Sequence, residues 1–237
     1  MVKLTGPSDS QSEATSPPRE PDDRSDNAHR QLIGYIGLAL PLILWLIAGW
    51  RPTGLSPRWK PVDSISAYYY SGAVVAFVGL LVALALFLIT YRGFENTYGW
   101  VDRLAARIAG CAALLVAFFP TTAPDGYPEL PWWTALSRVV HYASAIVLFF
   151  MFALFCLWLF RMSSTDPPPP DKRRRNLIYI LCGIAILIGM GWAAVAGRNE
   201  QPIFWPESLA LIAFAISWLV KGRAPRTIAN AVRDTLS

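Results

Sequence analysis

His141 is the residue of this sequence best suited to chemistry, because it is a histidine within an apolar segment. An imidazole has an unperturbed pKa of about 6.5, so it can act as a proton acceptor, a ligand or a pH sensor. Ser144 follows three residues later, which is the same face of a helix. A serine nucleophile needs such a base and a third group that orients the base. The candidate nucleophiles are Ser66 and Ser144, and the candidate third groups are Asp63, Asp125 and Glu207.

Polar and aromatic side chains, these candidates among them, gather in three stretches of the chain, residues 63–70, 121–144 and 198–207. If these stretches meet at one membrane surface, they can line a site for a lipid or small molecule. The candidate ligand-binding residues are Tyr70, Thr121, His141, Ser144 and Glu207. Each has a structural alternative: the aromatic rings suit an interfacial belt, His141 can bond a loop carbonyl, and Glu207 suits the first turn of a helix.

The residues that bind metals in proteins are sparse in the apolar part of the chain. A catalytic zinc site takes about three protein ligands, and one histidine with dispersed carboxylates supplies too few. Cys111, Cys156 and Cys182 fall within apolar runs and lack the short spacings of a metal site. The sequence therefore predicts no metal and no cofactor.

The composition predicts a bilayer as the environment that positions these residues. Hydrophobic residues make up 54% of the chain and charged residues 16%, with a mean hydropathy of +0.37. Apolar segments in a bilayer must satisfy their own backbone hydrogen bonds, so they are expected to be helical. The prediction is an all-α integral membrane six-helix bundle over residues 30–222. Its helices cover residues 32–50, 72–90, 104–119, 139–160, 176–196 and 206–220, and whether the last of these fully spans is left open.

Two further patterns predict how the bundle is arranged. Of the 21 Lys and Arg residues, 16 are predicted to lie on the same side of the membrane as the N-terminus. Basic residues favour the cytoplasmic side, and six spans return the chain to the side where it began, so both termini are predicted to be cytoplasmic. Residues 1–29, rich in Ser, Pro, Asp and Arg, predict a disordered tail, and residues 223–237 a short basic one. Alanine and glycine at four-residue spacing in residues 104–119 allow close helix approach, so this helix is predicted to lie at the centre.

A basic run between the fourth and fifth predicted helices follows four prolines at residues 167–170. The prolines predict a stiff polyproline II spacer. The basic run is predicted to contact anionic lipid headgroups. It consists of Lys172, Arg173, Arg174 and Arg175. Membrane lipids are the expected partners, and nucleic acid is not expected because orientation explains the positive charge.

Several short stretches are distinctive when taken together: SISAYYYSG, YRGFE, AFFPT, HYASA and IFWPESLALIAFAISWLVKG. In combination they resemble a group of uncharacterised bacterial multi-pass membrane proteins, over about residues 30–223. The resemblance implies a six-helix architecture in the bacterial inner membrane and carries no activity. Ser66, Tyr70, Thr121, His141, Ser144 and Glu207 all lie within these stretches.

Three functions are compatible with these patterns. The first is a non-enzymatic membrane protein that binds a lipid or small molecule at an outward-facing site. The second is a membrane-embedded lipid hydrolase that uses His141 as base with Ser66 or Ser144, although no nucleophile-elbow motif flanks either serine. The third is a small transporter or channel, against which stands the lack of charged residues at mid-bilayer depth in four of the predicted helices.

Overall fold

The computed structural model describes residues 23–54, 58–93, 99–162 and 170–223, and these contain helices and no strand. The predicted all-α fold is confirmed, and each predicted helix has a counterpart. The six α-helices and two short 3₁₀ helices are α1 (Asp23–Trp50), η1 (Ser66–Tyr70), α2 (Val74–Ile89), α3 (Gly99–Phe118), α4 (Ala135–Leu157), η2 (Leu159–Arg161), α5 (Pro170–Arg198) and α6 (Phe204–Lys221).

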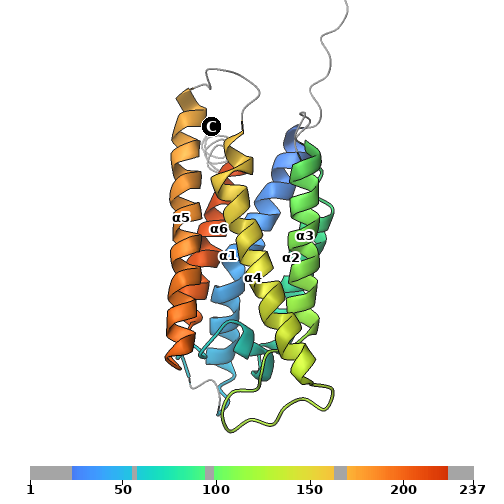
Figure 1. The fold of residues 1–237 in the computed structure, drawn as a ribbon, viewed down its shortest axis with the longest axis vertical. Helices are drawn as coiled ribbons and strands as arrows, with labels where there is room; N and C mark the ends of the chain where they lie inside the picture. Colours follow the sequence, from blue (N-terminus) through green and yellow to red (C-terminus); the bar gives the residue numbers. More distant parts are fainter. Residues whose placement is uncertain (1–22, 55–57, 94–98, 163–169, 224–237) are drawn as a thin grey trace, which may run out of the picture.

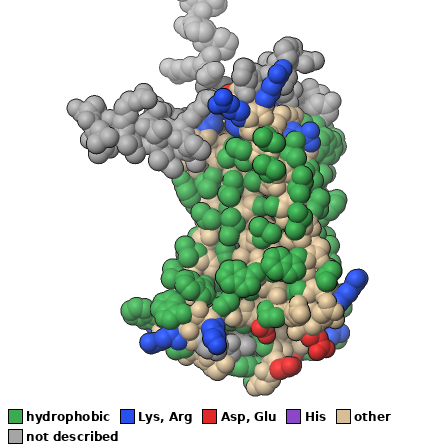
Figure 2. All heavy atoms as spheres, turned by 90° about the vertical axis from the view of Figure 1, so that its left-hand side faces the viewer, with side chains coloured by type: hydrophobic (Ala, Val, Ile, Leu, Met, Phe, Trp, Pro, Cys, Tyr) green, Lys and Arg blue, Asp and Glu red, His purple; other side chains and the backbone are tan. Residues whose placement is uncertain are grey.

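Four of the helices, α1, α4, α5 and α6, are long and apolar enough to cross a membrane. The helix α2 is apolar but shorter, with 16 residues, and α3 carries Asp102, Arg103 and Arg107. Figure 2 shows a broad band of hydrophobic side chains across the middle of one face of the molecule, with charged side chains above and below it. This distribution and these helix lengths are those of an integral membrane protein.

The helices form two layers of three, with α5, α4 and α3 in front of α6, α1 and α2 (Figure 1). Helices that follow one another in sequence pack side by side, and α6 also packs against α1. We call the end formed by residues 58–73, 119–134 and 199–203 the lower end, and the opposite end, where α1 begins and α6 ends, the upper end. All three segments predicted to carry polar groups therefore meet at the lower end.

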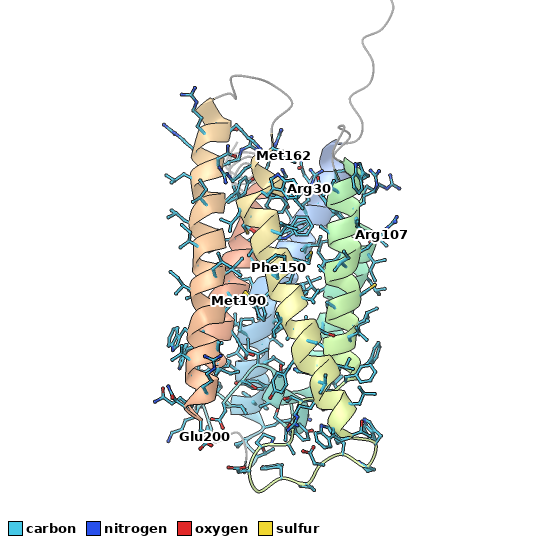
Figure 3. All side chains as sticks on the ribbon, viewed as in Figure 1. Arg30, Arg107, Phe150, Met162, Met190 and Glu200 are labelled. Carbon is cyan, nitrogen blue, oxygen red and sulfur yellow. The ribbon has the colours of Figure 1, made fainter. Side chains whose placement is uncertain are left out.

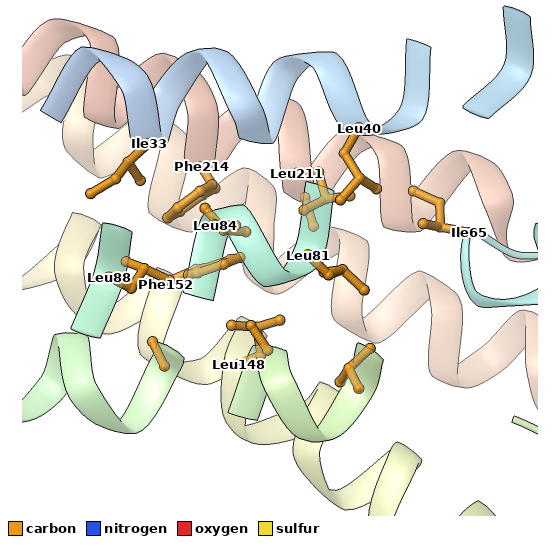
Figure 4. Close-up of a cluster of buried hydrophobic side chains, with 14 of the residues drawn as sticks. Ile33, Leu40, Ile65, Leu81, Leu84, Leu88, Leu148, Phe152, Leu211 and Phe214 are labelled. Atoms are coloured by element: carbon orange, nitrogen blue, oxygen red, sulfur yellow. The ribbon is translucent and has the colours of Figure 1, made fainter. Parts of the chain in front are cut away.

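The predicted central place of residues 104–119 is wrong, because α3 lies at a corner of the bundle and packs against α2 and α4, whereas α4 and α1 lie in the middle of the two layers. The membrane-span window of α6 is 61% buried, the largest share among the four apolar spans. The rings of Phe152 on α4 and Phe214 on α6 stack at 3.6 Å in the core shown in Figure 4. The small residues of α3 instead let it approach α2: a Cβ on Gly110 would lie 2.6 Å from Ile89 Cγ1.

All the α-helices except α2 begin earlier in the chain than predicted, and the difference is largest for α1. The helix α1 starts at Asp23, so residues 23–29 are helical where a disordered tail was expected, and residues 1–22 lie outside the described residues. Tertiary hydrogen bonds explain the extension: His29 Nε2 lies 2.7 Å from the Phe87 carbonyl oxygen, and Gln31 Nε2 donates to the Gly222 carbonyl at 2.7 Å. These contacts join the start of α1 to the ends of α2 and α6.

The basic run predicted to lie in a loop belongs to the first turns of α5. The helix starts at Pro170, and the residues before it, 163–169, lie outside the described residues, as does most of the predicted polyproline segment. Within the run, Arg173 and Arg174 are exposed, whereas Lys172 is buried and donates to the Phe160 carbonyl at 2.7 Å. Helical periodicity turns Lys172 inward, away from the surface where it was predicted to bind headgroups.

Candidate functional site

A cavity of about 490 Å³ lies at the lower end, between α4, α5, α6 and the segment before α2. Figure 3 shows Met190, which lines it, near the middle of α5, and Glu200 beyond the end of that helix. The cavity therefore reaches from the lower end toward the middle of the bundle. Its polar lining consists of Ser64, Ser66, Thr121, His141, Tyr142, Arg198 and Glu207, and its apolar walls include Ala145, Ile146, Phe149, Met190 and Ala194.

Ser66 and His141 form a hydrogen-bonded pair at this cavity. His141 is 1% exposed; its Nε2 lies 2.9 Å from Ser66 Oγ, and its Nδ1 lies 2.7 Å from the Phe119 carbonyl oxygen. A carbonyl oxygen only accepts, so Nδ1 must carry the ring proton of the neutral imidazole. It follows that Nε2 is the acceptor and that the Ser66 hydroxyl donates to it.

Local structure explains why these two side chains meet. The helix α3 ends at Phe118, ahead of Pro120, which cannot continue its hydrogen bonding, so the Phe119 carbonyl is available to a side chain. On α4, Thr134 and Ser137 form a capping box, which starts the helix earlier than predicted and sets its register. On the other side, Ser64 Oγ accepts the Ala67 N–H at 2.9 Å and shapes the turn that presents Ser66.

Glu207 lines the same cavity and ties the segment before η1 to α6. Its Oε2 accepts the Ile65 N–H at 2.6 Å. The Asp63 carbonyl accepts the Ile203 and Phe204 N–H groups at 2.6 and 2.9 Å, so it caps the start of α6. Glu207 therefore binds the neighbouring segment through a backbone amide, which goes beyond the predicted role in its own helix.

The third group of the predicted triad is not one of the three proposed carboxylates. The side chains of Asp63 and Asp125 are exposed, and Glu207 bonds Ile65. The group that orients His141 is the Phe119 backbone carbonyl. A carbonyl fixes the tautomer as a carboxylate does, but it carries no net charge to stabilise an imidazolium.

Two predicted site residues do not line the cavity. Tyr70 donates to the Thr121 carbonyl at 2.7 Å and to Glu129 Oε2 at 3.2 Å, and burial together with the Glu129 carboxylate raises the pKa of its phenol. Ser144 is buried but faces a groove between α3 and α4 lined by Arg107. Viewed down α4, Ser144 lies about 60° to one side of His141, because three residues turn a helix by about 300°. Ala145 lies about 40° to the other side, because four residues turn it by about 400°, and it is Ala145 that lines the cavity.

Three polar residues of the cavity lie within the predicted stretches but were not among the five candidate ligand-binding residues: Ser64, Tyr142 and Arg198. Tyr142 follows His141 directly, and its hydroxyl accepts from Thr121 Oγ1 at 3.1 Å. Arg198 ends α5 and is exposed at the rim of the cavity. Its place in sequence, at the end of an apolar run, was the available signal for an interfacial cation. Among the described residues, no group of three His, Cys, Asp or Glu side chains is placed to hold a metal ion.

The comparisons with known proteins give a family without an activity. The DUF998 family, described as a protein of unknown function, matches residues 35–224. This range includes every residue that lines the cavity. The searches of curated proteins and of solved structures give no match. The chemistry of this site must therefore be argued from its own geometry.

Proposed function

We propose that this chain, which belongs to the DUF998 family of proteins of unknown function, is a six-span inner-membrane protein that binds an amphipathic lipid in the cavity beside His141. The observation that carries the proposal is the cavity itself. Its volume of about 490 Å³ suits a small-molecule ligand, and polar groups converge at one end of apolar walls. A ligand with one polar and one apolar end matches that division.

The cavity is open toward the hydrophobic band of the surface. Ile146 on α4 is 62% exposed and also lines the cavity, and Ala194 on α5 is likewise exposed. Both helices are long and apolar enough to cross a membrane. An acyl chain could therefore enter sideways from the bilayer, between α4 and α5, without passing through water.

The polar end of the cavity supports an anionic headgroup. Arg198 is exposed at the rim and can pair with a phosphate or carboxylate oxygen through two N–H groups. The Tyr142 hydroxyl, which accepts from Thr121 and keeps its own proton, can donate to the oxygens that link a headgroup to its chains. An ester-linked lipid with a negative headgroup is the ligand class that fits both features.

The distribution of charge supports an orientation with both termini in the cytoplasm. The exposed Arg173 and Arg174 lie at the upper end with Arg223, and in the face shown in Figure 2 the Asp and Glu side chains lie mainly at the lower end. Basic residues favour the cytoplasmic side, which would put the cavity in the outer half of the membrane. Arg173 and Arg174 are the residues of the basic run that remain available to anionic headgroups.

Native mass spectrometry of the purified protein in mild detergent tests lipid binding. Ala194→Trp is expected to fill the cavity and abolish retention of a defined lipid. Val195→Trp is its matched control, because Val195 is exposed on the same helix and does not line the cavity. His141→Ala should also lower retention, whereas Ser144→Ala should leave it unchanged. Equal, non-selective lipid adducts on all five proteins would refute the proposal.

A further inference from the structure

We infer that Ser66 is a nucleophile activated by His141, and that the cavity hydrolyses an ester bond of the lipid it holds. The inference rests on the proposed function, since it takes the bound lipid as substrate. It depends on a separate observation, the hydrogen bond of 2.9 Å between Ser66 Oγ and His141 Nε2. That distance lies within the range of an activated serine and its base.

The orientation of the imidazole favours proton transfer from Ser66. Nδ1 is held at 2.7 Å by the Phe119 carbonyl, so the lone pair of Nε2 faces the Ser66 hydroxyl. Ser66 is half-buried and lines the cavity, while His141 is almost fully buried behind it. The nucleophile therefore faces the bound molecule, and its base is shielded from bulk water.

The reaction balances with water as the second reactant. Ser66 Oγ attacks the ester carbonyl carbon while His141 Nε2 takes its proton, and the ester C–O bond breaks. His141 gives the proton to the departing oxygen, which leaves as an alcohol, and an acyl group remains on Ser66. Water then attacks this acyl group with His141 again as base, which releases a carboxylic acid and restores both residues.

Two neighbouring groups support this reaction. The Tyr142 hydroxyl accepts from Thr121 Oγ1 at 3.1 Å and lines the cavity, so its own proton can be donated to the ester oxygen that becomes negative. The Glu207 side chain lines the same cavity. Glu207 also holds Ile65, the residue before Ser66, and so acts as a positioning residue.

A fluorophosphonate probe tests the nucleophile in the full chain, purified in mild detergent. The wild type is expected to be modified at Ser66, as identified by mass spectrometry of the labelled peptide. Ser66→Ala should remove this label, and His141→Gln should slow labelling by on the order of 10²-fold or more, since loss of a general base has that effect. Ser144→Ala is the serine control that should keep the Ser66 label, because Ser144 does not line the cavity.

The outcomes separate this inference from lipid binding. A Ser66 label that depends on His141 and is lost in Ala194→Trp but kept in Val195→Trp would support a nucleophile within the cavity. If the wild type retains a defined lipid in native mass spectrometry but resists the probe, the nucleophile is refuted and lipid binding stands. If the probe modifies Ser66 equally in His141→Gln, activation by His141 is refuted. Because glutamine can still donate to the Phe119 carbonyl, this variant should keep the local fold.

Discussion

Replacing Glu207 with alanine is expected to lower the free energy of unfolding by about 1–3 kcal/mol. The Glu207 side chain accepts the N–H of Ile65 at 2.6 Å, and leaving a buried N–H without its acceptor costs about 1–3 kcal/mol. Ile65 is 5% exposed, so its amide would lose its acceptor in a place that water reaches poorly. The contact also spans the chain, from the segment before η1 to the first turn of α6, so its loss loosens two elements.

Two variants provide the comparison. Glu207→Gln keeps a carbonyl oxygen that can accept the same N–H, so it should lose less than about 1.5 kcal/mol, the range of a neutral hydrogen bond. Glu200→Ala removes an exposed carboxylate beyond the end of α5 and should stay within about 0.5 kcal/mol of the wild type. Because Ile65 precedes Ser66, Glu207→Ala should in addition slow fluorophosphonate labelling more than Glu207→Gln does.

Reversible unfolding in mixed micelles, followed by the fluorescence of the 10 tryptophans, measures these differences. The reasoning is refuted if Glu207→Ala is as stable as Glu200→Ala. It is also refuted if the glutamine variant is as unstable as the alanine variant, because the loss would then not depend on an acceptor for the Ile65 amide.

The same unfolding assay checks three further predictions. Gly110→Ala should destabilise the protein by about 1–3 kcal/mol, since its Cβ would lie 2.8 Å from a backbone oxygen of α2. Gly79→Ala, with open space at its Cβ, should instead stabilise it by about 0.5–1 kcal/mol. Equal effects of the two substitutions would contradict the close approach of α3 to α2. Phe152→Ala should cost about 3–5 kcal/mol because its ring is fully buried, and the half-exposed Phe150→Ala should cost far less. Tyr70→Phe should cost about 0.5–1.5 kcal/mol, the value of its lost hydrogen bond, and leave the Ser66 label unchanged. If this variant loses the label, Tyr70 takes part in the site.

The sequence by itself was enough to predict the helices and the candidate chemical groups. Long apolar runs must be helical in a bilayer, and that requirement acts locally, so each predicted helix is found in the structure. Residue type alone identified His141 as a candidate base, because a histidine is rare in an apolar run. It also identified Ser66 as one of two candidate nucleophiles. The four-residue spacing of small side chains on α3 predicted close packing, but it did not show which helix α3 would pack against.

Tertiary structure decided what lies beyond the reach of local patterns. The starts of α1 and α5 depend on partners far along the chain, such as the Phe87 and Phe160 carbonyls, so composition misjudged them. The choice of Ser66 over Ser144 depends on which side of α4 faces the cavity, and sequence spacing allowed either. The group that orients His141 is a backbone carbonyl, which every residue possesses and which no residue type can reveal. A cavity, finally, is a volume that distant helices leave unfilled, so only their packing determines it.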